Sequence, residues 1–520
     1  MIEPDRLIGR IPWLALVAGL SLVAPVEAGS ASTAANPPSR MPAFTLFGWL
    51  SPPNAVADSS RIAELAEAGF NVMLPAYNDS GIAATNLARL DLAAAHGLAC
   101  LIADERFLGL DPATPGGSAL LDSIMAQYGD HPALLGWYLG DEPLPPWNLL
   151  PPLHAALKAR DATRIPYNNL HGRQRFASHD AWIAYTQDFM ASMQPQVLSN
   201  DQYDFLATRD RLQFTENAQG SMEKAQEAGI PWWAVIYLIE HAPYRAIGEG
   251  ELRWQAAHAL AHGARGIGYF SYWTPDPHPV LNWGDGIIGR DLQPSFWYPI
   301  VKALNRRLKL AGEILASSSW KVTGYTGSMP PYGGLFVTGV GLVDSVQGRA
   351  AIGSFQRNGR EFLLVAASDS IAASSVRLVL RGAGIVHERS EGPVPRIEER
   401  PDDLVVSIDL APGDFVLLEV EGSASEAGGL RIPPDLGILP NPAVSEVEFR
   451  VDYVRGIGTV VILDSSGRRV WSTSVPPGSS RRTWRGERDT GGTARAGIYF
   501  VRIEDDLGHS VRRFAWLGSR

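Results

Sequence analysis

Residues 230–274 read IPWWAVIYLIEHAPYRAIGEGELRWQAAHALAHGARGIGYFSYWT, two short apolar runs separated by one longer amphipathic segment. The runs IPWWAVIYL and GIGYFSYWT have the length and the aromatic and β-branched content of buried strands. The segment ELRWQAAHALAHGA between them is rich in helix-forming residues and contains a late glycine that suits a helix C-cap. The stretch therefore predicts one strand–helix–strand unit of a parallel sheet.

The same alternation extends from residue 44 to about residue 315. Eight runs are typical of strands: FTLFGWL from Phe44, FNVMLPAY from Phe70, LACLIADE from Leu98, LLGWYLGDE from Leu134, RIPYNNLH from Arg164, QVLSNDQYDF from Gln196, IPWWAVIYL from Ile230 and GIGYFSYWT from Gly266. Eight such units in this length predict an α/β fold, a TIM (β/α)₈ barrel, which we assign to residues 40–318. The alternative is a doubly wound open sheet. That fold ordinarily carries a glycine-rich loop after its first strand, and GWLSPPN lacks the pattern.

The composition indicates a globular chain with room for several domains. Of 520 residues, 45% are hydrophobic and 19% are charged, and the formal net charge is −10. Nucleic-acid binding depends on clustered Lys and Arg, so this acidic balance argues against a nucleic-acid partner. The lone Cys100 excludes an intrachain disulfide, and its apolar surroundings LACLIAD predict a buried position.

Residues 1–28 have the pattern of a bacterial export signal peptide. Arg6 and Arg10 precede an apolar run from Ile11 to Val26, and small residues around Ala28 suit cleavage. The alternative is an uncleaved anchor, but the run is shorter than the ~20 residues that a spanning helix needs. We therefore expect a secreted or cell-surface protein with no transmembrane span in its mature chain.

Polar and aromatic residues gather at the ends of the expected strands, where such barrels carry their chemistry. In GWYLGDEP, Asp141 and Glu142 end the fourth strand. The candidate substrate-binding residues at strand ends are Asp141, Trp49, Tyr77, Asp104, Asn169, Tyr203, Tyr272 and Trp273. Aromatic faces stack on sugar rings while carboxylates and amides bind hydroxyls. The sequence therefore predicts a carbohydrate substrate.

The layout resembles the clan A glycoside hydrolases, most closely the β-galactosidase-like barrels of family 42. The likeness rests on the acid ending GWYLGDEP and on the passage GELRWQAAHALAHGARGIGYFSYW, and it covers roughly residues 40–320. It implies that Glu142 is the acid/base glutamate of strand four. It also implies a nucleophile glutamate ending strand seven, but the first acid there, Glu240, comes several residues late. Asp141 stands where the clan usually has asparagine.

Glycoside cleavage needs a second carboxyl group opposite the first. In VLSNDQYDF, period-two alternation places Ser199, Asp201 and Tyr203 on one face, so Asp201 is able to reach the pocket. We therefore favour Asp201 over Glu240 as the partner of Glu142. The same alternation turns Asp141 away from Glu142 unless the strand ends in a bulge. A non-catalytic glycan-binding barrel, a pseudoenzyme without the strand-seven nucleophile, is the alternative function.

Several residues also have purely structural interpretations. The pair Trp232 and Trp233 is more typical of barrel packing than of a sugar platform, and His171 and His241 are expected to be hydrogen-bonding loop residues. Asp104 suits a helix cap as well as it suits sugar binding. No Cys/His spacing indicates a metal site, and no motif calls for a cofactor.

The remainder of the chain reads as β-structure. From residue 319 to residue 422, short alternating runs between Gly, Asp and Pro turns predict a β-sandwich, and SASEAGG lies in an expected linker, residues 423–436. Residues 437–520 resemble the immunoglobulin-like C-terminal sorting domains of secreted bacterial proteins, on motifs such as Trp484-Arg485-Gly486 and Ala496-Gly497-Ile498-Tyr499. This implies contact with secretion machinery or the cell surface. The alternative is a carbohydrate-binding module, which would expose Trp471, Trp484 and Trp516 on one sheet face.

Overall fold

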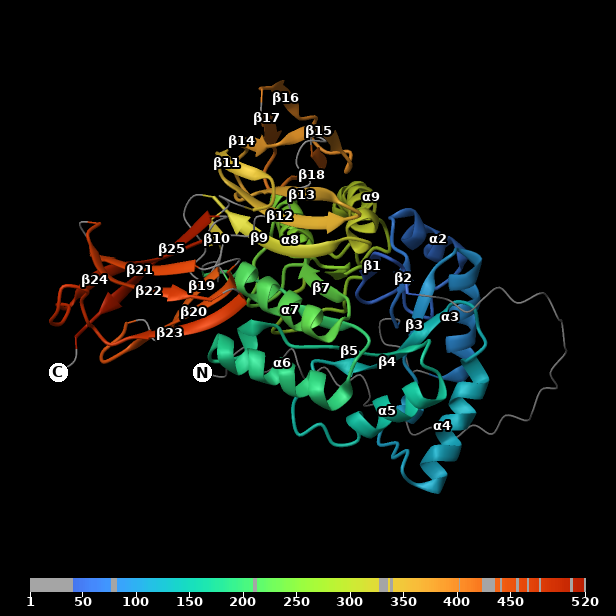
Figure 1. Ribbon diagram of the computed structural model, residues 1–520. Helices are drawn as coiled ribbons and strands as arrows, with labels where there is room; N and C mark the ends of the chain where they lie inside the picture. Colours follow the sequence, from blue (N-terminus) through green and yellow to red (C-terminus); the bar gives the residue numbers. More distant parts are fainter. Residues whose placement is uncertain are drawn as a thin grey trace.

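The computed structural model describes three consecutive units (Figure 1). The described residues are 41–75, 82–208, 213–326, 335–336, 340–401, 403–422, 435–439, 442–454, 458–464, 467–476, 478–505 and 508–518. Three predicted features lie outside this set: the signal peptide, Tyr77 and residues 423–434 of the linker.

The first unit is a closed parallel barrel, as the eight apolar runs predict. Its strands are β1 (Thr45–Gly48), β2 (Val72–Met73), β3 (Ala99–Ile102), β4 (Leu134–Asp141), β5 (Ile165–Asn169), β6 (Leu198–Asp201), β7 (Trp232–Tyr237) and β8 (Gly266–Phe270). They are ordered β5-β4-β3-β2-β1-β8-β7-β6. A parallel bridge between Leu170 and Asn200 joins the two edges, and the Leu170 N–H donates to the Ser199 carbonyl at 2.8 Å.

Helices follow the strands and cover the barrel. They are α2 (Ser59–Glu67), α3 (Ala83–Ala95), α4 (Pro115–Tyr128), α5 (Leu150–Arg160), α6 (His179–Met193), α7 (Phe214–Ala228), α8 (Glu249–Ala261) and α9 (Trp297–Ala316), with short 3₁₀ turns η1 (Glu105–Phe107) and η2 (Arg173–Arg175). The expected glycine cap follows α8, where Gly263 has φ of 89°, and Gly97 after α3 has φ of 68°. These left-handed positions suit glycine, which has no Cβ.

Aromatic side chains fill much of the barrel interior. Trp233 packs against Phe47 and Tyr167, with ring centroids 5.6 and 5.7 Å away. Trp232 is also fully buried and donates its indole N–H to Asn200 at 2.7 Å. The prediction of packing for this tryptophan pair is therefore confirmed, and Cys100 is buried as expected.

The second unit is a sandwich of two sheets. Its strands are β9 (Ser319–Tyr325), β10 (Leu335–Phe336), β11 (Val343–Gln347), β12 (Ala350–Arg357), β13 (Arg360–Ala367), β14 (Ser374–Arg381), β15 (Ala383–Glu388), β16 (Arg396–Glu399), β17 (Asp403–Leu410) and β18 (Phe415–Gly422). The sheets are ordered β10-β9-β12-β13-β18-β15 and β11-β14-β17-β16.

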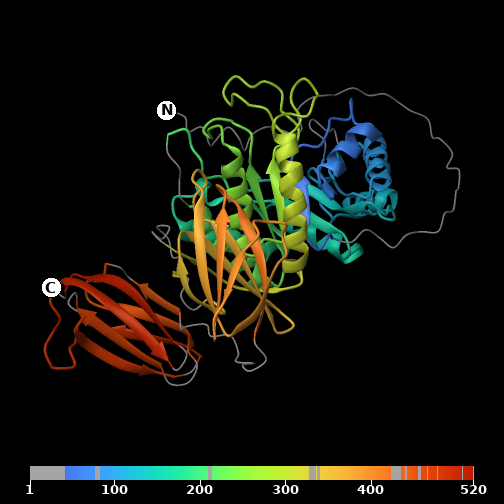
Figure 2. The ribbon, with the colours of Figure 1, turned by 90° about the horizontal axis from the view of Figure 1, so that it is seen from above.

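The larger sheet of this sandwich is buried on both faces. In β13, Phe362 and Leu364 belong to the barrel's core, whereas Leu363 and Val365 belong to the sandwich core. Because successive side chains of a strand point to opposite faces, a continuous apolar run such as FLLVAA serves both cores. Figures 1 and 2 show this unit against the side of the barrel formed by α8 and α9.

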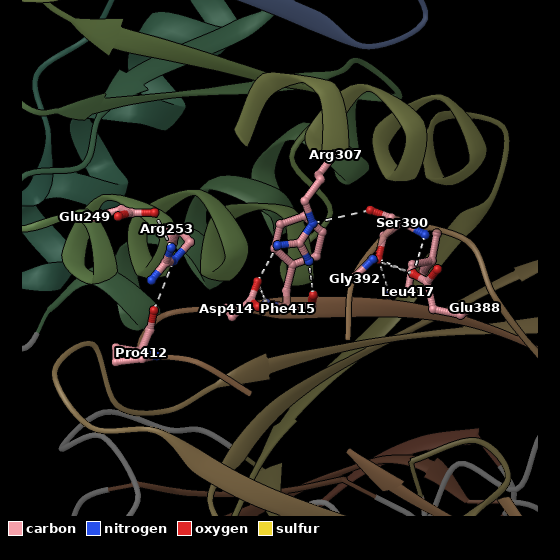
Figure 3. A network of polar contacts seen from close by, with 10 residues as sticks. All are labelled: Glu249, Arg253, Arg307, Glu388, Ser390, Gly392, Pro412, Asp414, Phe415 and Leu417. Atoms are coloured by element: carbon pink, nitrogen blue, oxygen red, sulfur yellow. Dashed lines mark hydrogen bonds and ion pairs between the residues drawn. The ribbon is translucent and has the colours of Figure 1, made fainter. Parts of the chain in front are cut away.

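Polar contacts also join the barrel to the sandwich (Figure 3). Arg307 on α9 donates to Asp414 at 2.5 Å and to the Phe415 carbonyl, and its guanidinium lies 4.5 Å from the Phe415 ring centroid. Arg253 on α8 donates to the Pro412 carbonyl at 3.1 Å. The two units therefore share both an apolar and a charged interface.

The third unit has a core of its own. Its strands are β19 (Asp435–Leu439), β20 (Val447–Val454), β21 (Gly458–Asp464), β22 (Arg469–Val475), β23 (Gly478–Trp484), β24 (Gly497–Asp505) and β25 (Gly508–Trp516), in sheets ordered β19-β20-β23 and β22-β21-β24-β25. Trp484 and Trp516 are buried in this core, and Trp471 is partly buried against it. The exposed tryptophan face expected of a carbohydrate-binding module is therefore not formed by these residues. None of the described helices is long and apolar enough to cross a membrane.

Candidate active site

A recess opens where β4, β5 and β6 end. It is lined by Glu142, His171, Gln174, Arg175, Asp201, Tyr203 and Tyr244. These residues come from the ends of three strands, from η2 after β5 and from the loop after β7. In barrels of this kind the carboxyl ends of the strands carry the functional groups. The recess is therefore the candidate active site.

The end of β4 is irregular, and this irregularity places Glu142. The pairing of β4 with β5 shifts register between Tyr138 and Gly140, as in a β-bulge. Glu142 then takes a left-handed backbone conformation, with φ of 46°, which is uncommon for a residue other than glycine. The Glu142 N–H donates to the Asn169 carbonyl at 2.8 Å, which holds this turn onto β5. The bulge that strict alternation required is thus present.

Asp201 occupies the facing position at the end of β6. Ser199 and Asp201 share one face of this strand, and both side chains hydrogen-bond to Asn169. The Ser199 hydroxyl donates to Asn169 Oδ1 at 2.9 Å, so the Asn169 amide is oriented with its nitrogen toward the acids. That nitrogen donates to Asp201 at 2.8 Å and to Asp141 at 3.2 Å. Asn169 therefore ties the ends of β4, β5 and β6 together.

The side chains of Glu142 and Asp201 hydrogen-bond directly to each other. Burial, followed by the charge and hydrogen bond of Glu142, raises the pKa of Asp201 well above its usual range. Two carboxyls in contact do not readily ionise together, so the pair holds one proton at neutral pH. Burial and the neighbouring Glu142 both favour the protonated form of Asp201 in this contact.

His171 supports Glu142 from the other side. Its Nδ1 lies 2.9 Å from Glu142 Oε1. Burial lowers the pKa of His171 to about 4, Asp201 opposes this shift and Arg175 adds to it. The imidazole is therefore neutral at pH 7, and with its proton on Nδ1 it donates a hydrogen bond to the Glu142 carboxylate.

Asp141 ends β4 immediately before Glu142 and does not belong to the recess lining. Desolvation and the nearby Asp201 raise the pKa of Asp141 to about 8. The hydrogen bonds from Asn169 and from the Glu142 backbone act in the opposite direction and lower it. The residue nevertheless keeps more than a third of its surface in contact with solvent. Solvent screens the charge of Asp141, so only the direction of this pKa shift, which is upward, is relevant to the chemistry.

We expect Asp201→Asn to raise the thermal midpoint at pH 7 by about 2–4 °C. The folded protein keeps the Asp201 proton above pH 3.8, the ordinary pKa, whereas the unfolded chain releases it. The stability of the wild type therefore falls as the pH rises from about 4 toward neutrality. The asparagine variant does not lose this stability, because asparagine does not titrate. Thermal unfolding at pH 4 and pH 7 measures the effect. A stability gain that is no larger at pH 7 than at pH 4 contradicts it.

Gly172 fits the chain tightly against β6. A Cβ at this position would lie 2.4 Å from the Asp201 carbonyl oxygen, which is backbone and does not move freely. We therefore expect Gly172→Ala to displace η2 and to cost about 1–3 kcal/mol of stability. Gly116→Ala in α4 is the matched control, because a Cβ there meets nothing within 4 Å. Denaturant unfolding of both variants tests this, and equal effects would contradict it.

The other sequence candidates lie in different surroundings. Trp49 is buried in the barrel beside Phe47 and Tyr138, and Trp273 is 5% exposed. Tyr272 is fully buried, edge-on to Phe70, and so offers no surface to a sugar. Neither Tyr272 nor Trp273 lines the recess.

Two acids proposed from the sequence also lie outside the recess lining. Asp104 caps η1 and accepts hydrogen bonds from Arg106 and Tyr128, with its side chain entirely buried. Its structural interpretation as a cap therefore holds. Glu240 follows β7 and is exposed. The structure brings Asp201 to Glu142 and does not bring Glu240 there.

Sequence reasoning missed Gln174, Arg175 and Tyr244 as lining residues. They lie in loops beyond the strand ends, where period-two alternation no longer applies. The basic cluster in HGRQRF, after the fifth strand, was the one available signal for Arg175. His171 was expected to be a hydrogen-bonding residue, and it bonds to Glu142. Among the described residues no group of three or more His, Cys, Asp or Glu side chains is placed to hold a metal ion.

The fold and this recess define a (β/α)₈-barrel protein with a carboxyl pair at the ends of β4 and β6. No protein-family pattern matches the chain, and no curated protein matches it in sequence. Similar solved structures include a glycoside hydrolase family 5 protein from Bacteroides vulgatus, with 13% identity over 74% of this chain and 90% of that chain and a TM-score of 0.45.

Two further solved structures are also similar to this chain. One is a β-galactosidase from the haloarchaeon Halorubrum lacusprofundi, with 13% identity over 51% of this chain and 58% of that chain and a TM-score of 0.39. The other is a β-glucuronidase from Parabacteroides merdae, with 11% identity over 91% of this chain and 63% of that chain and a TM-score of 0.32. This chain thus covers less than two thirds of either enzyme. Identities of this size do not carry an activity from those proteins to this chain.

Proposed function

We propose that the chain is an exported glycoside hydrolase that cleaves O-glycosidic bonds of oligo- or polysaccharides. Glu142 serves as general acid/base, and Asp201 is its partner, as nucleophile or as activator of water. One observation carries the proposal: two carboxyls from different strands hydrogen-bond in a recess at the barrel mouth, and the pKa of one is raised. Glycosidases need such a pair with unequal proton affinities.

The chemistry assigned to the pair needs one proton and one negative charge. The protonated carboxyl delivers its proton to the departing glycosidic oxygen, and the ionised carboxyl attacks the anomeric carbon or deprotonates water. For Glu142 to be the acid, the proton that rests on Asp201 must pass across their hydrogen bond as the sugar enters. Asn169 then stabilises the ionised Asp201, because its amide nitrogen already donates to that carboxyl.

A non-catalytic glycan-binding barrel is the second candidate. The contact between Glu142 and Asp201 favours it, because retaining glycosidases separate the two carboxyls by about 5 Å and inverting ones by more. The exposed position of Glu240 leaves β7 without an acid in the recess lining. Under the enzymatic proposal, the sugar must part the two carboxyls on binding.

The experiment that separates the two candidates is a hydrolysis screen. The full chain is incubated with 4-nitrophenyl glycosides of both anomeric configurations and with plant and microbial polysaccharides. The proposal expects release of nitrophenol or reducing ends that the variant Glu142→Gln/Asp201→Asn does not produce. Saturable binding of a polysaccharide without any release would instead support the glycan-binding barrel.

We also propose that residues 437–520 attach or export the protein. This unit has its own buried core around Trp484 and Trp516, apart from the cores of the barrel and the sandwich. We therefore expect deletion of residues 437–520 to leave the specific activity of the barrel within about twofold, while the protein is released from the surface or retained in the cell. Fractionation and activity assays test this. Loss of activity in a folded truncated protein would contradict it.

A further inference from the structure

Arg175 is the permanently charged cation among the residues that line the recess. The other basic lining residue, His171, is neutral at pH 7 because burial and Arg175 lower its pKa to about 4. Within the described parts of the chain, no carboxylate pairs with the Arg175 guanidinium. Arg175 is half-buried in η2 and lines the recess, where none of the described carboxylates forms an ion pair with it.

The recess acids Glu142 and Asp201 contact groups other than Arg175. The largest influences on the pKa of Asp201 are its burial, Glu142, Asn169 and His171. Glu142 contacts His171 at 2.9 Å and hydrogen-bonds to Asp201. The positive charge of Arg175 lowers the pKa of His171 and so disfavours protonation of the imidazole. This leaves the planar donors of Arg175 available to a group that enters from solvent.

We propose that the recess takes a sugar with an anionic substituent, a carboxylate or a sulfate ester, and that Arg175 binds this anion. The inference rests on the proposed glycosidase function and names its substrate class. A guanidinium presents parallel N–H donors that match the two oxygens of a carboxylate, and charge-assisted hydrogen bonds of this kind are strong. A neutral His171 beside it adds no competing cation, and the shared proton limits the Glu142–Asp201 pair to a single negative charge.

Matched substrates test the proposal with little ambiguity. The full chain is assayed with 4-nitrophenyl glucuronides and galacturonides of both anomeric configurations, with the corresponding glucosides and galactosides, and with their 6-O-sulfated forms. Each set differs only at C6. We expect kcat/KM at least tenfold higher for the anionic member, and the preferred anion identifies a carboxylate or a sulfate ester. A wild-type enzyme that prefers the neutral hexosides overturns the inference and leaves the glycosidase proposal standing.

Variants of η2 assign the preference to a residue. Arg175→Met is expected to bring the ratio of anionic to neutral kcat/KM close to one, and Arg175→Lys to retain part of it. Arg173→Met is the matched control, because Arg173 lies in the same turn outside the recess lining and donates to the Phe176 carbonyl. A ratio also cancels any loss of folded protein. An unchanged ratio in Arg175→Met overturns the proposal.

A binding measurement covers the case in which no glycoside is cleaved, which would refute the glycosidase function. Calorimetric titration with D-glucuronate, D-galacturonate, glucose 6-sulfate, glucose and galactose then decides the inference separately. Binding of an anionic sugar that is at least tenfold weaker in Arg175→Met supports it. Equal affinity for anionic and neutral sugars, or no binding of the anionic ones, overturns it.

Discussion

Asp201→Asn is expected to lower hydrolysis of both aryl glycosides and natural glycosides by roughly 10⁴-fold, the upper end of what one positioned carboxyl contributes. Without this carboxyl nothing attacks the anomeric carbon or activates water, whatever the leaving group. The substitution is nearly isosteric, and an asparagine oxygen still accepts the hydrogen bond that Asn169 donates to Asp201. The loss of rate should therefore come from the missing carboxyl group and not from a disrupted fold. Steady-state kinetics together with thermal unfolding of the same sample measures it.

Glu142→Gln is the contrasting variant. A nitrophenolate leaves without protonation, so this variant should keep much of the aryl glycoside rate while losing turnover of natural glycosides. Glu240→Gln should behave like wild type, because Glu240 is exposed outside the recess lining. The reverse pattern, with aryl turnover spared in Asp201→Asn, would exchange the two roles. Loss of aryl turnover in Glu240→Gln would contradict the site itself.

Arg307→Met is expected to cost about 3 kcal/mol of stability, the typical result of removing one member of a buried pair. The side chains of Arg307 and Asp414 are 18% and 12% exposed, so the change leaves a largely buried carboxylate without its partner. It also removes the donors to the Phe415 and Ser390 carbonyls (Figure 3). The barrel and the sandwich should therefore unfold at lower denaturant concentration. Equilibrium unfolding followed by tryptophan fluorescence measures the change.

The neighbouring residue gives a matched control. Arg306 pairs with Glu391 at 2.9 Å, but their side chains are 71% and 48% exposed. Exposed pairs contribute little, so Arg306→Met should change stability by less than about 1 kcal/mol. Equal losses in the two variants would show that the interface does not depend on the Arg307 contact.

The barrel could be predicted from the sequence because its strands are buried and parallel. Such strands read as continuous apolar runs, and IPWWAVIYL and GIGYFSYWT correspond to β7 and β8. The position of Asp201 followed from the same physics, since alternation along β6 places it on the face of Ser199. Glu142 was identified by its place after β4. From the sequence, the bulge was only the condition under which Asp141 would lie beside it.

Tyr272 and Asp104 lie outside the recess lining, because packing and capping decide the direction of these side chains. Tyr272 follows β8 in sequence, yet its ring packs against Phe70, because one residue of register decides which way a strand-end side chain points. Asp104 shows the same limit, since an acid that precedes a turn caps it as readily as it binds a ligand. Arg175 lies in a turn after β5, beyond the reach of any strand periodicity.

Azide rescue of Asp201→Asn is the sharpest test of whether Glu142 and Asp201 act as a carboxyl pair on a glycosidic bond. Azide is a small anion that fits the space left by the lost charge, and its attack on the anomeric carbon needs no base. With a 4-nitrophenyl glycoside that the wild type cleaves, we predict that azide restores turnover and that the product is a glycosyl azide of inverted anomeric configuration. Absence of rescue in Asp201→Asn, with an inverted glycosyl azide formed instead by Glu240→Gln, would show that Glu240 and not Asp201 is the partner of Glu142.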